Sequence, residues 1–514
     1  MIQGLDLRYT ITTQAATTVL AYAPKGWEEG LIKWVRSEKY WGMFRSFSIP
    51  MQFYKDGKDI LCAVYASEGS EGYAEILIER IDRSTGLYKT YFKAVADFTQ
   101  FKWTDLYCEV NLIEGGISKK IKDLEAIKYD ILKPTGTPIT WTDVKFVSGG
   151  LYTIQVIDLE QVLTRLLHHM TGGWVGVESE LLDDYTASNS HFYLINGRGI
   201  RTGQAGNMQM SFADLFQALN AAFCMGCGVE STIGGDILRL DSRAYFLQNT
   251  EILAATINAS ETTIAPAKQF LANKMKYGFS TWDPQSQNND PVANRFSKEC
   301  ECSIPTITSK GEVAASSDFF ADGEYMTYLY GLDGGAGSIY EDVSGDNDIF
   351  ILHVKHDGGQ KYMWEGTCMG VAGAKNTYLG SKQMLINWKS YLESITKGIV
   401  NTNIDPYLIT VLPHGWTGIH SRSDYTGNTL YEDEIVSLTG DGNIFSPYIF
   451  TIKTKGTVDI SDILEANHHG YISFNYKGVT LKGHIMEVSA NPTRRKVLDL
   501  TLLAHKDTDL SQIL

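Results

Sequence analysis

DLEQVLTRLLHHMTGG (Asp158–Gly173) and SFADLFQALNAAFCMG (Ser211–Gly226) are the two stretches of the chain that tell most about its fold. Each places apolar residues at i, i+3, i+4 and i+7, which is typical of an amphipathic helix with one buried face. Asp158 and Ser211 are helix-capping residues, followed three positions later by Gln161 and Asp214, and each stretch ends at glycine. The spacing therefore predicts two helices whose buried stripes include Leu163, Leu166, Phe216 and Leu219.

The two predicted helices are similar but not equal. Leu167 of the first corresponds to Asn220 of the second. Only the second leads clearly into a hairpin pattern, with a Gly234-Gly235 turn between Val229–Thr232 and Ile237–Leu240. Duplication and chance both explain the pairing, because amphipathic helices of this length resemble one another. We interpret 158–173 as a packing helix and 211–241 as a helix-and-hairpin unit, and we expect both helices to brace one β domain.

Most of the remaining chain has the pattern of strands and turns. Its 514 residues are too many for one ordinary core. Short stretches of alternating polarity, separated by glycine-bearing turns, favour sandwiches or barrels. The predicted class is mainly β with a few helices (α+β): several antiparallel β-sandwich or barrel domains plus a helix-hairpin domain. We expect an all-β domain at 1–135, an α+β domain with the two helices at 136–260, a β domain ending in a helix at 261–400, and a C-terminal β domain at 401–514.

Four local predictions bear on how these domains are built. The pattern predicts a helix at Gly26–Tyr40, a turn at Lys55–Lys58 and a strand at Ile60–Tyr65 in the N-terminal domain. A further helix is predicted at Gln383–Thr396, where apolar residues share one face. Other strands are predicted at Thr18–Tyr22, Met43–Phe53, Ala74–Arg80, Tyr88–Val95, Leu106–Leu112, Lys274–Phe279, Ser297–Ile304, Asp348–Val354, Glu434–Leu438, Tyr448–Thr454, Gly470–Tyr476, Lys482–Val488 and Lys496–Leu503.

The charge pattern bears on partners. The formal net charge of −15 argues against a broad phosphate-binding surface, which would need clustered Lys and Arg. Lys119, Lys120 and Lys122 fit a solvated face better than a local nucleic-acid patch. No apolar run approaches the roughly 18 residues of a membrane span, and Met1–Asp6 lacks the pattern of a secretory signal. We therefore expect no membrane contact and folding in a cytoplasm.

Clusters of metal-ligating residue types are present, but their spacing does not fit metal sites well. Cys224-x-x-Cys227 and Cys300-x-Cys302 could together bind zinc, yet small buried hydrophobes are the better interpretation. His168-His169 and His468-His469 are adjacent pairs, whose side chains point to different faces, so we interpret them as cap or surface histidines. Asp342, Asp346 and Asp348 lack the calcium-loop pattern and fit a solvated turn. We expect no metal, no cofactor and no catalytic residue.

Enzymatic motifs are weak. The chain has no Gly-x-Ser-x-Gly elbow, His-Glu-x-x-His or Walker-type loop. A glycosidase would need only two facing carboxylates. The candidates for such a pair are Asp318, Asp322 and Glu324, which lie among Phe319, Phe320 and Tyr325 and would equally fit a sugar-binding face.

A succession of segments along nearly the whole chain resembles a family of tail proteins from bacteriophages of Bacteroidetes, including crAss-like phages. The segments are Pro24–Trp27 with Arg36, Tyr40 and Gly42; Ser211–Phe216 leading to Leu238–Leu240; Asn273–Gly278; Asp346–Phe350; and Phe445–Pro447 followed by Gly483–Val488. The helix and hairpin at 211–241 also resemble tail-hub proteins of long-tailed phages. Cys224 and Cys227 depart from what this resemblance leads us to expect.

The resemblance implies a structural component of the virion tail, not an enzyme. It implies a ring-like tail hub or distal-tail assembly linking the tail tube to tip or fibre proteins, as a homo-oligomer (trimer or hexamer) assembled in the host bacterial cytoplasm. Its other partners would be tail proteins and, transiently, passing genomic DNA, which an acidic lumen would keep from sticking. A carbohydrate-binding host-adhesion protein is the alternative, and a glycoside hydrolase is the third.

Overall fold

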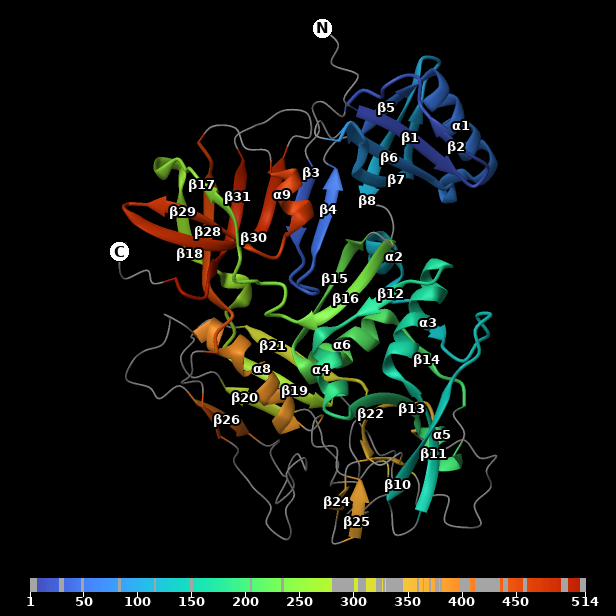
Figure 1. Ribbon diagram of the computed structural model, residues 1–514, viewed down its shortest axis with the longest axis vertical. Coiled ribbons are helices and arrows are strands. Elements are labelled where there is room, and N and C mark those ends of the chain that lie inside the picture. The colour runs from blue at the N-terminus through green and yellow to red at the C-terminus, as the bar shows by residue number, and fades with distance from the viewer. Residues whose placement is uncertain are drawn as a thin grey trace.

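The computed structural model is mainly β with several helices, and the predicted α+β class is confirmed (Figure 1). No helix among the described residues is long and apolar enough to span a bilayer. The structure describes residues 7–26, 32–47, 50–81, 85–114, 117–147, 151–203, 206–232, 235–279, 300–303, 311–319, 326, 329, 345–357, 360–363, 365–368, 371–374, 379, 381–396, 407–411, 435–437, 442–455, 460–490 and 498–508.

One 14-stranded sheet runs through the upper half of the molecule and contains strands from both ends of the chain (Figure 1). Its first part consists of β1 (Leu7–Thr13), β2 (Thr17–Val19), β3 (Ile32–Arg36), β4 (Met43–Phe47), β5 (Met51–Tyr54), β6 (Ala74–Ile81), β7 (Tyr88–Trp103) and β8 (Tyr107–Glu114). Its second part consists of β17 (Glu251–Ala255), β18 (Thr263–Pro266), β28 (Phe445–Lys453), β29 (Tyr471–Tyr476), β30 (Val479–Ala490) and β31 (Asp499–His505).

The two parts of this sheet meet where β3 pairs with β30. The pairing is antiparallel and runs from Ile32 opposite Ala490 to Val35 opposite Glu487. A single buried cluster, which we call the sheet core, lies under both parts and draws residues from 9–112, 255–257 and 450–504. Helix α9 (Ser461–Ala466) contributes Leu464 to it. The N-terminal and C-terminal regions are therefore packed as one body.

Three predictions in the N-terminal region are wrong. Lys55–Glu68 form helix α1, where a turn at Lys55–Lys58 and a strand at Ile60–Tyr65 were expected. Its buried residues are Gly57, Leu61 and Val64, which are spaced three or four positions apart. The core is therefore contacted by one face of a helix and not by a continuous apolar strand.

Conversely, strand β3 occupies residues 32–36 of the predicted helix at Gly26–Tyr40, and residues 27–31 of that prediction lie outside the described residues. Ile32, Trp34 and Arg36 are buried there in strict alternation, a period of two. Trp34 and Val35 do share a helical face in sequence, but Val35 is exposed in the structure. Pairing with β4 and β30 on both sides decides in favour of the strand.

Below the sheet lies a second cluster, the helix–barrel core, with residues from 117–240 and 319–384 together with Tyr40 and Phe44. A closed barrel forms one part, from β10 (Trp141–Val147), β11 (Leu151–Asp158), β13 (Ser190–Asn196), β22 (Ile349–Asp357) and β23 (Gln360–Met363). The other elements are α2 (Ile117–Leu124), β9 (Tyr129–Asp130), α3 (Leu159–Thr171), β12 (Gly176–Glu178), α4 (Glu180–Ala187), α5 (Gly197–Thr202), β14 (Gln209–Met210), α6 (Phe212–Phe223), β15 (Met225–Thr232) and β16 (Gly235–Ser242).

The two predicted helices are confirmed as α3 and α6, and their apolar stripes are buried in the same core. Ser211 and Asp214 form the reciprocal capping box, each side chain accepting from the other residue's backbone N–H. Asp158 caps α3, but Gln161 accepts from the Thr140 backbone instead of closing a box. Helix α6 ends at Cys224 in the left-handed conformation, two residues before the expected Gly226.

The hairpin after α6 is also confirmed, since β15 pairs with β16 in antiparallel register. The predicted helix at Gln383–Thr396 is α8 (Ser381–Thr396). It packs on a sheet of β19 (Lys274–Phe279), β20 (Cys300–Ser303), β21 (Glu312–Ser317), β26 (Tyr407–Val411) and β27 (Ile435–Ser437); β24 (Glu365–Cys368) and β25 (Val371–Ala374) form a separate pair. The cluster under α8, which we call the α8 core, contains Trp41, Phe246 and Phe445.

Each of the three cores therefore draws residues from more than one of the four expected domains. Segments of two cores meet at Gly42, which follows Trp41 of the α8 core and whose backbone N–H donates to the carbonyl of Cys227 in the helix–barrel core at 3.1 Å. A Cβ at Gly42 would lie 2.4 Å from that carbonyl oxygen and 2.6 Å from the Gly228 Cα. Only glycine fits between β4 and β15 at this point.

We expect Gly42→Ala to destabilise the protein by at least about 2 kcal/mol, because two backbones must separate to admit one methyl group. Urea denaturation followed by tryptophan fluorescence measures the change. The matched control is Gly173→Ala, because a Cβ at Gly173 meets no atom within 4 Å. Equal stability of the two variants would contradict the close approach.

Candidate functional site: a buried polar junction

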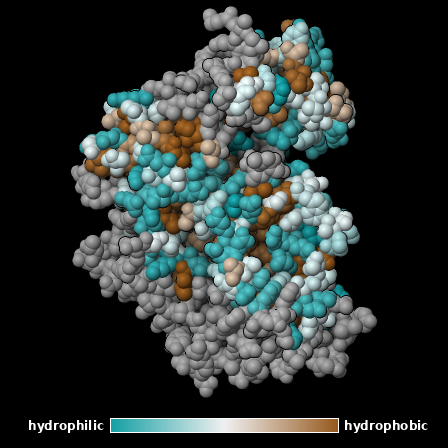
Figure 2. Space-filling model, in the orientation of Figure 1, coloured by the Kyte–Doolittle hydropathy of each residue, from teal (hydrophilic) through white to brown (hydrophobic). Residues whose placement is uncertain are grey.

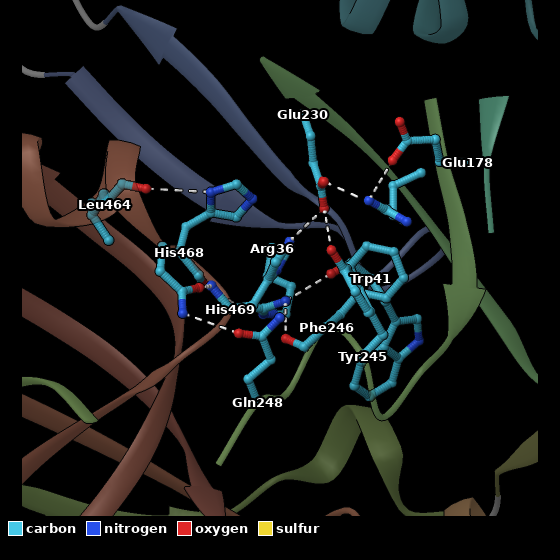
Figure 3. A network of polar contacts seen from close by, with 12 residues as sticks. Arg36, Trp41, Glu178, Glu230, Tyr245, Phe246, Gln248, Leu464, His468 and His469 are labelled. Carbon is cyan, nitrogen blue, oxygen red and sulfur yellow. Dashed lines mark hydrogen bonds and ion pairs between the residues drawn. The ribbon is translucent and has the colours of Figure 1, made fainter. Parts of the chain in front are cut away.

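Arg36 lies at the end of β3, where the sheet core, the helix–barrel core and the α8 core come together (Figure 3). Its side chain is 2% exposed. Nε donates to the Ile485 carbonyl at 2.9 Å, Nη1 to those of Trp41 and Phe246 at 2.8 Å, and Nη2 to that of His468 at 3.1 Å. One guanidinium thus joins four separate segments of the chain.

Among the described residues no ion pair neutralises Arg36, so backbone dipoles take the place of water around its charge. Burial lowers the pKa of Arg36 to about 9. Because that value still lies above neutral pH, the side chain remains a cation in the folded protein. Removing it would leave four carbonyls without a donor in a buried site.

Glu230 on β15 is the anionic centre of the same junction (Figure 3). One oxygen accepts from the Tyr245 hydroxyl at 3.0 Å and lies 3.2 Å from His469 Nε2, and the other accepts from Arg239 at 3.4 Å. Arg239 also pairs with Glu178 of β12 at 2.7 Å. Burial raises the pKa of Glu230, but the His469 hydrogen bond and the nearby Arg239 outweigh it and lower that pKa below its ordinary value.

Histidines from the C-terminal part of the chain fill the other side of the junction. His469 is 5% exposed and buried against Tyr245 and Phe246, which corrects the expectation of a cap or surface histidine. His468 lies beside it, and its Nδ1 is 3.3 Å from the carbonyl of Leu464 in α9. His468 therefore contacts the C-terminal end of that helix. Burial lowers the pKa of His469, and Arg36 lowers it further.

A second pair of histidines lies behind this one in the sheet. His484 and His505 are both buried, with ring centroids 5.2 Å apart. Burial lowers the pKa of His484 to about 3, with Arg36 and His505 adding to the effect. The His484 ring is therefore neutral at physiological pH, and Arg36 is the cation at the centre of the junction.

Arg243 ties the junction to the α8 core. Its guanidinium carbon lies 5.1, 4.4 and 4.6 Å from the ring centres of Trp41, Trp388 and Tyr391. Its Nη2 donates to Asn220 of α6 at 3.0 Å. Trp41, whose carbonyl accepts from Arg36, thus also stacks in the cage around the next arginine.

The predicted metal candidates are not brought together. Cys224 and Cys227 are buried, free thiols in different cores, as expected for small hydrophobes. Cys300 and Cys302 lie on β20, and their side chains fall outside the described residues. Among the residues the structure describes, no group of three His, Cys, Asp or Glu could bind a metal ion.

The remaining histidine and lysine candidates lie on helix surfaces. His168 and His169, in the last turn of α3, are half-buried and stack on Trp174 and Tyr129 respectively. The predicted lysine patch belongs to α2: Lys119 pairs with Asp123, Lys120 donates to the Thr171 carbonyl, and Lys122 lies 4.2 Å from the Phe44 ring centre. The predicted solvated face is thus only partly found, because Lys119 and Lys120 are half-buried and Lys122 alone is exposed.

The acidic loop before β22 is not a solvated turn. Asp346 is buried and accepts from Nε and Nη2 of buried Arg201 at 3.0 and 2.6 Å. Its carbonyl accepts from Arg198, and that of Asp348 accepts from Gly197, so the loop closes over the start of α5. Asp342 lies outside the described residues.

Of the proposed carboxylate candidates, only Asp318 is described, and it is exposed after β21. Burial raises the pKa of Asp318, with Asp214 adding to the rise. Phe319 is buried in the helix–barrel core and cannot form a sugar platform. Asp322 and Glu324, with Phe320 and Tyr325, lie outside the described residues.

Sequence analysis did not find the polar junction. Arg36 and Gly42, and the segment Gly483–Val488 with His484, were noticed only as carriers of the family resemblance. No spacing rule links Arg36 to Phe246 or Ile485, because these residues meet only in the folded chain. The one local sign of the junction is a charged residue at an inward-facing position of an alternating strand, Arg36 in the sequence IKWVR.

No protein-family model and no curated protein matches the sequence. Among solved structures, prophage tail protein gp18 from Listeria monocytogenes EGD-e aligns with 98% of this chain and 96% of its own, at 9% identity and a TM-score of 0.37. The 43 kDa tail protein of prophage MuSo2 from Shewanella oneidensis aligns with 98% of this chain and 99% of its own, at 7% identity and a TM-score of 0.38. The tail protein from Neisseria meningitidis MC58 aligns with 97% of this chain and 96% of its own, at 8% identity and a TM-score of 0.37. Identities and TM-scores this low do not establish a shared fold or function.

We expect Arg36→Met to lower the free energy of unfolding by about 3–5 kcal/mol, because four buried carbonyls lose their donor. Arg36→Lys should recover only part of this, since an ammonium cannot reach all four acceptors. Chemical denaturation measures both changes. Lys33→Met on the same strand is the control, because its pair with Glu487 is exposed and spans 3.5 Å. A loss no larger than that of the control would contradict the role of Arg36.

Stability should also fall on acidification from pH 6.5 towards 4.5. The folded pKa of His484 is lowered from 6.5 to about 3, so its contribution is complete above 6.5 and is lost as the unfolded chain binds the proton. His484→Leu should reduce the slope of unfolding free energy by up to about 1.4 kcal/mol per pH unit. Urea titrations across this pH range measure the slope for both proteins. At pH 8, where the histidine is neutral in both the folded and the unfolded chain, the difference in unfolding free energy between wild type and variant reports the change in packing alone. An unchanged slope would contradict the burial of a neutral ring.

Proposed function

We propose that this protein is a structural component of a bacteriophage tail, forming a ring-like tail hub or distal-tail assembly that links the tail tube to tip or fibre proteins. One observation carries the proposal. Arg36, Gly42 and the His484–Ile485 segment, which carry the resemblance to phage tail proteins, meet in one buried junction that joins the three cores. The residues that resemble the family are thus the ones that fix the protein's internal geometry.

A fixed geometry is what a ring subunit requires. Closed rotational symmetry is reached only if each subunit presents its two contact surfaces at a constant angle. Here a shared sheet joins the two ends of the chain, Arg36 joins that sheet to the α8 core, and Gly42 contacts the helix–barrel core at Cys227. The proposed role is structural and not enzymatic, with a trimer or a hexamer as the expected ring.

The strands at the two ends of the main strand order, β18 and β2, differ in how they could meet a neighbour. At one edge, β18 ends in Pro266, which cannot donate to a further strand. At the other edge, β2 pairs with β1 among the described strands, and its Val19 is 56% exposed. Figure 2 shows hydrophobic residues in several separate patches on one face, scattered among hydrophilic ones. We assign β2 as the edge that a neighbouring subunit extends.

We expect the purified chain, alone or with adjoining tail proteins, to form a closed ring visible by light scattering and electron microscopy. Val19→Lys should convert the ring to monomers, because a buried edge contact cannot accept a lysine. Leu87→Lys, at a residue that is 68% exposed outside the edge strand, should leave the ring intact. A strictly monomeric chain under all these conditions would contradict the proposal, as would a glycan-dependent change in tryptophan fluorescence without any ring.

A further inference from the structure

Two cysteines in the N-terminal region lie on the two sides of a helix–sheet contact. Cys62 lies on α1 and is half-buried, whereas Cys108 lies on β8 and is fully buried. Cys108 is the register partner of Phe53 on β5, the strand that leads directly into α1. Helix α1 therefore packs back over β8, Cys62 lies against the sheet core that contains Cys108, and each thiol shifts the pKa of the other.

The two thiols differ in access and in acidity. Burial raises the pKa of Cys108 to about 12, and the neighbouring Cys62 adds to the rise. Burial also raises the pKa of Cys62, but Lys58, one turn earlier on the same helix, opposes the shift, whereas Asp59 reinforces it. Cys62 is thus the thiol that a solvent-borne reagent reaches, and Cys108 is the thiol held beneath it.

We propose that Cys62 and Cys108 are a redox-modifiable pair that closes to a disulfide between α1 and β8 on meeting a small-molecule disulfide. This proposal does not depend on the tail function. The Cys62 thiolate attacks one sulfur of oxidised glutathione, forming a mixed disulfide and releasing one glutathione thiolate. Cys108 then loses its proton and attacks the Cys62 sulfur, which forms the Cys62–Cys108 bond and releases the second thiolate. Two thiols are oxidised and one glutathione disulfide is reduced to two glutathione molecules.

The other described cysteines are placed differently and serve as internal controls. Cys224 is packed in the α8 core and Cys227 in the helix–barrel core, so the two thiols face different surroundings. Both are buried, and burial raises the pKa of each, to about 11 for Cys224. Neither combines the access of Cys62 with a thiol partner, so neither should react in the folded protein.

The bond would have a structural consequence. It would close a loop containing β6 and β7 and fix α1 to the sheet. Closing a loop of this length restricts the unfolded chain, so the oxidised form should unfold at a higher temperature. The helix that sequence analysis mistook for a strand is thus the element that the proposed bond would fasten.

The test treats the folded, full-length protein with oxidised glutathione at pH 8. Peptide mapping without reduction should find the Cys62–Cys108 cross-linked peptide, and the melting temperature should rise by a few degrees, reversibly with a dithiol reductant. Cys108→Ser should stop the reaction at a stable glutathione adduct on Cys62. Cys62→Ser should abolish both products, and Cys224→Ser should change neither.

Two results would overturn the proposal. One is a wild-type chain in which Cys62 retains glutathione and no cross-linked peptide forms, since Cys108 would then be out of reach. The other is a folded chain in which Cys62 does not react, while the denatured chain does. Because mapping identifies the peptides directly, the wild-type result stands even where a serine variant fails to fold.

Discussion

The structure depends on one buried cation whose hydrogen bonds are all to backbone. Arg36 donates to carbonyls of four segments, and each segment ends or bends where regular pairing stops. Trp41 adopts a left-handed conformation to present its carbonyl, and Gly42 follows it against the Cys227 backbone. A carboxylate partner would neutralise the charge but would satisfy only part of the guanidinium. Four carbonyls use its planar set of donors and fix the positions of four backbones at once.

Other buried arginines also join irregular segments to the cores, and one of them, Arg165, again uses backbone carbonyls. Arg165 of α3 donates to the carbonyls of Ile131, Thr137 and Lys133, which secures the segment between β9 and β10. Arg201 pairs with Asp346 and closes the loop before β22, and Arg243 lies in an aromatic cage beside α8. Backbone groups in turns have no ladder partner, and a buried one costs about 1–3 kcal/mol when unsatisfied. Buried arginines supply the missing donors.

Secondary structure could be predicted from the sequence where apolar periodicity and capping residues agree. It was predicted wrongly where tertiary contacts favour a different element. The helices at 158–173, 211–226 and 383–396 could be predicted because apolar spacing, caps and length point the same way. Ile60–Tyr65 is apolar enough for a strand, but Leu61 and Val64 face the core only as a helix. The polar junction could not be predicted, because Arg36, Glu230 and His469 are far apart in sequence and no local rule relates them.

The polar contacts of Arg36 explain why the junction fixes the relative positions of the segments it joins, in addition to stabilising the fold. An apolar side chain of similar volume could fill the space of Arg36, but hydrophobic contact is non-directional and tolerates small shifts between bodies. Hydrogen bonds of 2.8–3.1 Å to four carbonyls do not tolerate such shifts, because they weaken steeply when misaligned. The cost of burying the charge is met by those four dipoles acting together. Displacing any one segment therefore leaves both a donor and an acceptor without a partner, so the sheet core and the α8 core keep one relative orientation or separate altogether.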